Sequence, residues 1–282
     1  MRYPMKRALF LTLLLPGLAF AGKAFDVEHT SSAELIEYLD HGAWEFRYDA
    51  ARELERRCVP QADEKLAALV ELEPNNKVRL AAMVTLEKCK HESALLAAET
   101  MSLVDSEDSH RQKAIAIIEK LGNERSGPVL SQVLKGDPEE DVRLKAAKVL
   151  RKRAWKGAEP VQEEIARRDP SRELRQEAVL GLMMVDPDRY RPLLHELLTK
   201  DTNERLRREL VEWIEKRPKA ADKDALVLAL DDVNPHVARH AARALVRLGD
   251  RSVAEVLREK ALHVTDRKVA EEFSEAAARL GG

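Results

Sequence analysis

Residues 141–150, DVRLKAAKVL, contain the pattern from which the architecture of this chain follows. Val142, Ala146 and Leu150 are four residues apart, so in an α-helix they share one face. The pattern occurs eight times at a nearly constant spacing along the chain. Its first core-facing residue, called position 0, is Phe46, Val78, His110, Val142, Leu174, Leu206, Val237 or Val269. A fixed period of this length is typical of repeat proteins.

The rest of each copy is equally regular. Position 4 is Ala in six copies and Leu or Phe in the others, and position 8 is Leu, Ile or Ala. A second apolar face precedes each copy, for example Leu130, Val133 and Leu134, and Gly136-Asp137-Pro138 predicts a turn between two helices. Neither short helix can bury its apolar face alone. We therefore predict an all-α fold, an α-solenoid of about eight two-helix repeats with a period of about 32 residues.

A polar pattern accompanies the apolar one. An Arg follows position 0 in six repeats, and an acidic residue stands five residues before position 0 in six repeats. We expect each acid to cap the second helix and to accept hydrogen bonds from an Arg of the same or the next repeat. This structural ladder comprises Glu73, Asp105, Asp137, Asp169, Asp201 and Asp232 with Arg47, Arg79, Arg111, Arg143, Arg175 and Arg207. It weakens where Ala238 and Ala270 replace the Arg.

Turns followed by V-R-x-x-A-A-x-x-L, as in residues 141–150 and most clearly in residues 234–257, resemble the short HEAT-like repeats of the phycobilisome-lyase type. The resemblance covers roughly residues 31–280. It implies an α-solenoid. It implies little about function, because such arrays serve as adaptors, inhibitors and, at times, enzyme scaffolds.

Residues 1–21 have the features of a signal peptide. Arg2, Lys6 and Arg7 precede an apolar stretch that ends in Ala19 and Ala21, the small-residue pair of a cleavage site. We expect cleavage after Ala21, no membrane insertion afterwards, and a periplasmic or secreted product. Residues 22–282 would form a single array, with an N-terminal cap at about 22–40 and a C-terminal capping repeat at about 251–282.

The chain has two cysteines, Cys58 and Cys89, at equivalent ends of neighbouring second helices. An oxidising compartment favours a disulfide between them. Stacked helices lie about 8–10 Å apart, whereas a bridge requires Cα atoms within about 7 Å. Two small buried residues that never pair are therefore the alternative.

No pattern for catalysis or for a cofactor stands out. His236 and His240 are four residues apart and form a weak candidate metal site, because no third ligand lies nearby in the sequence. Aromatic residues make up only 4% of the chain, few for a cofactor pocket. Without the signal peptide, 45 basic residues face 50 acidic ones, which gives no reason to expect nucleic-acid binding.

Positions 2, 3 and 6 of the second helices should point away from the core and form a surface of mixed sign. The candidate partner-binding residues on it are Tyr48, Arg52, Lys113, Lys145, Lys148, Arg208, Arg239, His240 and Arg243. Basic residues also gather at the ends of the second helices, beside acids that oppose their field. Trp155, expected to be partly exposed next to Arg151, is an alternative anchor for a partner.

These observations favour a monomeric, non-catalytic scaffold or adaptor of the periplasm or cell envelope that binds another protein and needs no cofactor. An accessory or lyase-like factor that handles a small molecule is the main alternative. A purely structural spacer of the envelope is a third interpretation.

Overall fold

The computed structural model describes residues 26–281, so the predicted signal peptide lies outside the described residues. Between these limits the chain forms sixteen α-helices and four short 3₁₀ turns, and no strand. The helices alternate along the chain as the first and second helices of eight pairs. The predicted all-α solenoid of about eight two-helix repeats is therefore confirmed.

The chain divides into two compact units, one ending at His91 and one beginning at Glu92. Whether residues 22–282 behave as a single array stays a prediction. The helices of unit 1 are α1 (Ser32–Tyr38), α2 (Trp44–Arg57), α3 (Asp63–Leu72) and α4 (Asn76–Lys88). Helix α2 packs against both α1 and α4, and α3 packs against α4.

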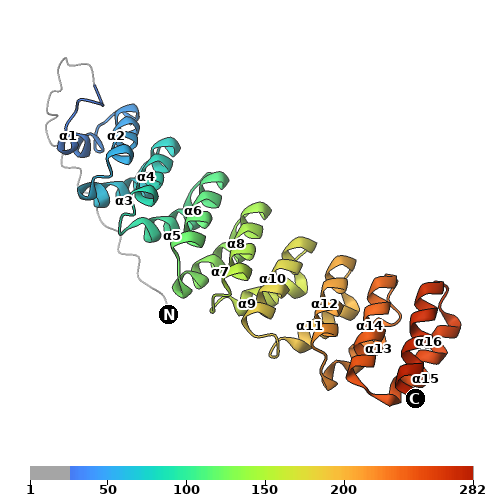
Figure 1. Ribbon diagram of the computed structural model, residues 1–282. Helices are drawn as coiled ribbons and strands as arrows, with labels where there is room; N and C mark the ends of the chain where they lie inside the picture. Colours follow the sequence, from blue (N-terminus) through green and yellow to red (C-terminus); the bar gives the residue numbers. More distant parts are fainter. Residues whose placement is uncertain (1–25, 282) are drawn as a thin grey trace. The chain divides into compact units, whose positions relative to one another are not determined.

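Unit 2 contains six helix pairs, with the odd-numbered helices in one layer and the even-numbered helices in the other (Figure 1). The odd-numbered helices are α5 (Ala94–Val104), α7 (Gly127–Gly136), α9 (Glu159–Arg168), α11 (Arg191–Lys200), α13 (Lys223–Ala229) and α15 (Ala254–His263). The even-numbered helices are α6 (Asp108–Leu121), α8 (Glu140–Arg153), α10 (Arg172–Val185), α12 (Glu204–Lys216), α14 (Pro235–Leu248) and α16 (Arg267–Gly281).

The periodic positions form the core. Every residue at positions 4 and 8 is buried, and so is position 0 in seven repeats. The exception is Phe46, which is half-buried and contacts the rings of Tyr38 and His41. Ala at position 4 leaves room for the neighbouring helices to pack closely, which explains its recurrence.

The disulfide predicted between Cys58 and Cys89 is present, with Cα atoms 5.0 Å apart. Both residues cap their helices: Cys58 ends α2 in the left-handed conformation, and Cys89 ends α4. Because the cysteines lie just beyond the helix bodies, their Cα atoms approach more closely than two stacked helix axes do. The bridge joins the first two repeats, and Cys58 is exposed.

Candidate interaction surface

The Arg–acid ladder is internal and links successive repeats. Arg175 donates from Nε and Nη2 to the two carboxylate oxygens of Asp201, at 2.8 and 2.9 Å, and from Nη1 to the Asp169 carbonyl at 2.9 Å. The guanidinium therefore joins the turn of its own repeat to the acid of the next one. The same bidentate form joins Arg47 with Glu73, Arg111 with Asp137, and Arg207 with Asp232.

The ladder acids do not cap the second helices, so that expectation is wrong. Asp201 is the C-cap of α11, and its carboxylate accepts the backbone N–H of Asn203 at 2.7 Å. Asn203, two residues later, is the N-cap of α12. Burial raises the pKa of Asp201, but the hydrogen bonds from Arg175 and from the Asn203 N–H outweigh it, so the pKa lies below its usual value.

The ladder is incomplete at one of the expected pairs. Among the described residues Arg143 donates only to the carbonyls of Asp137 and Pro138, at 2.8 and 3.1 Å, and makes no ion pair with Asp169. The ladder also ends at Asp232, because Ala238 removes the next guanidinium. Nη1 of Arg79 donates to the carbonyls of Glu73 and Pro74 in the turn of its own repeat, as Nη1 of Arg175 does to the Asp169 carbonyl.

This difference within the ladder gives a stability test. Arg175→Ala is expected to lower the free energy of unfolding by about 1–3 kcal/mol, because the buried carboxylate of Asp201 loses two charged donors. Arg143→Ala should cost clearly less, since no carboxylate depends on it. Urea unfolding followed by circular dichroism measures both values. Equal midpoints for the two variants would contradict the bidentate ladder.

A second row of ion pairs crosses the ends of the even-numbered helices. Position 9 is Glu in four repeats, and several of these carboxylates pair with a basic residue at position 10 of the next repeat. Nζ of Lys152 lies 2.5 Å from Glu119, and Nη2 of Arg247 lies 3.3 Å from Glu215. In unit 1, Lys88 and Glu55 repeat the arrangement at 3.0 Å. We call the position-10 residues the ridge.

Several predicted partner-binding residues are already engaged within the chain. Arg239 and Arg243 both reach Glu272 of α16, and the ring of His240 bonds to Glu215 at 2.5 Å. In unit 1, Arg52 pairs with Glu55, and Tyr48 is half-buried. The side chain of Arg208 is exposed and lies 3.7 Å from Glu212.

The lysines of α6 and α8 differ from those arginines. Lys148 is exposed, and neither it nor Lys145 forms an ion pair with another described residue. Lys113 and Lys145, which were expected to point away from the core, are half-buried. The stem of Lys145 packs on the even-numbered layer, which is ordinary for a long amphipathic side chain.

Trp155 is only 6% exposed, so the expectation of a partly exposed anchor is wrong. Its ring packs against Gly122, where an added Cβ would lie 2.8 Å from the ring, and the guanidinium of Arg153 lies over the ring, 5.0 Å from its centre. Trp155 therefore fills the corner between α6 and α7 and offers no surface to a partner.

Of the two histidines in the candidate metal site, only His240 makes a hydrogen bond with another described side chain. His236 is exposed, and its partner in the pattern, His240, is bonded to Glu215. Within residues 26–281 there is no group of three or more His, Cys, Asp or Glu side chains that could hold a metal ion.

A buried cluster in unit 2 has no counterpart in the repeat pattern. Asp222 is fully buried and accepts hydrogen bonds at 2.7 Å from Arg191 Nη1 and from the backbone N–H of Lys219, with His195 Nε2 at the same distance. Arg191 also stacks on Trp213 at 5.2 Å. The sequence does not reveal this cluster, because its members come from different repeats and no other repeat has an Arg at the position of Arg191.

None of the helices in the described part of the chain is long and apolar enough to cross a membrane. The family model for HEAT repeats matches residues 96–183 and 192–278. The chain belongs to the HEAT-repeat family. Both matched stretches lie in unit 2, and the repeats of unit 1 continue the same spacing.

Solved structures with similarity to this HEAT-repeat chain include YibA of Escherichia coli, 22% identical over 92% of this chain and 98% of that one, with a TM-score of 0.48. The complex of CpcE and CpcF of phycocyanin lyase from Nostoc sp. PCC7120 is 16% identical over 94% and 98%, with a TM-score of 0.39. Human deoxyhypusine hydroxylase is 15% identical over 80% and 98%, with a TM-score of 0.38. No curated protein matches the chain.

Proposed function

We propose that this HEAT-repeat chain is a non-catalytic scaffold that binds another protein through the even-numbered helices of unit 2. The observation that carries the proposal is the contrast between the buried ladder and Lys148. The ladder side chains make hydrogen bonds within the chain. Lys148 and Arg208, by contrast, are exposed on helices α8 and α12, whose apolar faces are buried. Exposed charges on a rigid surface favour recognition of a partner of complementary charge.

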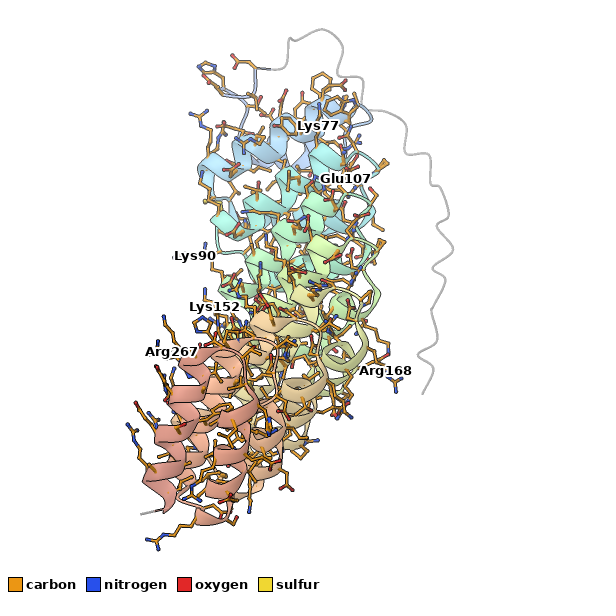
Figure 2. All side chains as sticks on the ribbon, turned by 90° about the vertical axis from the view of Figure 1, so that its right-hand side faces the viewer. Lys77, Lys90, Glu107, Lys152, Arg168 and Arg267 are labelled. Carbon is orange, nitrogen blue, oxygen red and sulfur yellow. A yellow bond between two sulfur atoms is a disulfide. The ribbon has the colours of Figure 1, made fainter. Side chains whose placement is uncertain are left out.

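The test reverses charge on one layer at a time. Lys148→Glu with Arg208→Glu changes the even-numbered layer, and Arg168→Glu with Lys200→Glu makes the same change on the odd-numbered layer, where both residues are exposed. Lys152 and Arg168 project from opposite sides of unit 2 (Figure 2), so the two layers are separate targets. The mature chain is used as bait in periplasmic extract.

We expect the even-layer variant to capture its partner about tenfold less efficiently, and the odd-layer variant to capture it normally. Both should keep the helicity and melting temperature of the parent, because the altered residues are exposed. Equal capture by the two variants, or no captured protein at all, would refute the proposed surface.

The compartment is part of the proposal and has its own test. Support comes from the basic start, the apolar stretch and the Ala19–Ala21 pair, together with a disulfide, which persists in oxidising compartments. We expect the exported protein to begin at Gly22. Intact-mass measurement on a periplasmic fraction checks this, and a cytosolic product that retains Met1 would overturn it.

A further inference from the structure

The ridge is interrupted at one repeat. Position 10 is basic in seven repeats, namely at Arg56, Lys88, Lys120, Lys152, Lys216, Arg247 and Arg279. In the fifth repeat it is Met184, near the end of α10, and this side chain is 63% exposed. An apolar side chain this exposed, in place of a solvated cation, contributes little to folding. Its position in the repeat therefore points to contact with something outside the chain.

The ion pairing of the ridge changes at the same place. In the repeat that precedes the one with Met184, position 9 is Arg151 rather than Glu. Nε of Arg151 lies 2.9 Å from a carboxylate oxygen of Glu177 in α10. In the fifth repeat itself, position 9 is Met183, which is buried. Lys216, at position 10 of the sixth repeat, therefore has no Glu opposite it. Two substitutions at equivalent positions thus replace carboxylates with a cation and an apolar group around Met184.

A hollow of about 500 Å³ lies at this interruption, between α6, α8 and α10. Val149 and Met184 supply its apolar lining, and Lys145, Lys148 and Lys152 surround it. The three lysines and Val149 stand three or four residues apart along α8, so they share one helix face. The hollow therefore combines an apolar patch with a rim of cations, and all of it belongs to unit 2.

The rim has an excess of positive charge. Lys152 pairs with Glu119, and Arg151 pairs with Glu177, which leaves the ammonium groups of Lys145 and Lys148 without a carboxylate partner among the described residues. Burial lowers the pKa of Lys145, and Lys113 lowers it further, against an opposing effect of Glu119. An added carboxylate near Lys145 would offset this cost of desolvation.

We propose that this hollow is the docking site for a protein segment in which an apolar side chain is flanked by acidic residues. The apolar side chain packs on Met184 and Val149, and the carboxylates pair with Lys145 and Lys148. The inference rests on the proposed function and specifies its partner. A segment fits better than an anionic membrane because Glu209 and Glu212 of α12 face the same layer and would oppose a broad anionic surface.

The probe is a phage-displayed library of random twelve-residue peptides, selected on the mature chain. Selected sequences should share an apolar residue between acids, and synthetic copies with Gln in place of the acids should not bind. Met184→Ala should weaken binding of the synthetic peptides about tenfold by titration calorimetry, and so should Lys145→Gln with Lys148→Gln. Leu228→Ala is the matched control, because Leu228 of α13 is 62% exposed.

Met184→Lys separates the peptide from a membrane. It restores the cation found in the other repeats, so an anionic surface should bind this variant more tightly, whereas the peptides lose their apolar contact and bind it more weakly. Vesicles of phosphatidylcholine with phosphatidylglycerol are the second probe. Vesicle binding that rises in Met184→Lys while peptide binding stays unchanged would overturn the proposal.

Peptides that lack the acid–apolar pattern, no enriched peptide, or equal binding by Met184→Ala would also overturn it. The wider proposed function is judged separately, from capture by the even-layer and odd-layer variants. If the even-layer variant loses its partner while Met184→Ala retains it, the scaffold surface stands and the hollow is not its docking site.

Discussion

Asp222→Asn is expected to lower the free energy of unfolding by about 3–5 kcal/mol, because it removes one partner of a buried ion pair. The carboxylate is fully buried and accepts hydrogen bonds at 2.7 Å from Arg191 and from the Lys219 N–H. Asn is nearly the same size, so packing is preserved. The variant deprives the guanidinium of Arg191, only 5% exposed, of its buried counter-charge and leaves only the exposed carboxylate of Asp188, 3.6 Å away.

Asp188→Asn is the matched control. The carboxylate of Asp188 pairs with Nζ of Lys219 at 2.6 Å and lies 3.6 Å from Arg191, but its side chain is 62% exposed. An exposed pair of this kind contributes about 1 kcal/mol or less. Urea unfolding of both variants at neutral pH gives the two free energies of unfolding. Similar losses of stability in the two variants would show that burial of the Asp222 cluster does not increase its contribution to stability.

The same cluster predicts how the difference in the free energy of unfolding between the parent and Asp222→Asn depends on pH. Burial raises the pKa of Asp222, but the bonds to His195, Lys219 and Arg191 outweigh it and hold the pKa below its ordinary value. A carboxylate with a lowered pKa in the folded state stabilises the protein above its unfolded pKa of about 3.9, and this stability is lost as the pH falls through the folded value. The gap between the parent and Asp222→Asn should therefore narrow below about pH 4.

The fold was predictable because its cause is periodic. Residues at positions 0, 4 and 8 recur in every repeat, and burial of one apolar face of each helix is sufficient to specify stacked helix pairs. The members of the ladder were predictable for the same reason, because Arg111, Arg175 and Arg207 stand at one repeat position. Their partners were not: each carboxylate pairs with the Arg of the preceding repeat, so the expectation of an Arg from the same or the next repeat is wrong. Cys58 and Cys89 also lie one repeat apart, so the period made a disulfide plausible, while the usual distance between stacked helices left unpaired cysteines as the alternative.

The features that the sequence did not reveal are those that depart from the period. Trp155 stands in a loop after α8, and only the close approach to Gly122 shows that it is buried. Arg191 and Asp222 meet outside the repeat positions, through a 3₁₀ turn at residues 220–222. Met184 is a different case, because comparison of position 10 across the eight repeats would have identified it. Its significance depends on its exposure and on the missing carboxylates, which require the structure.

Loss of the Cys58–Cys89 bridge is the second large effect that we expect, at about 3–4 kcal/mol for a disulfide that closes a loop of this length. The two cysteines are 31 residues apart, so the bond restricts the unfolded chain across almost one complete repeat. Repeat proteins unfold locally, because each repeat contacts only its neighbours. The loss should therefore fall on the helices of unit 1, while α14 and α16 keep their stability.

Hydrogen exchange under native conditions, measured for the parent with and without reductant and for Cys58→Ser with Cys89→Ser, resolves this prediction by helix. Amides of α2 and α4 should exchange faster in the double variant and in the reduced parent, and reductant should not change the double variant further. Amides of α14 provide the internal control. Equal protection of α2 and α4 in oxidised and reduced protein would contradict a stabilising role of the bridge. A confirmed effect would mean that the first two repeats reach full stability only in an oxidising compartment, since a reducing one would leave both thiols free.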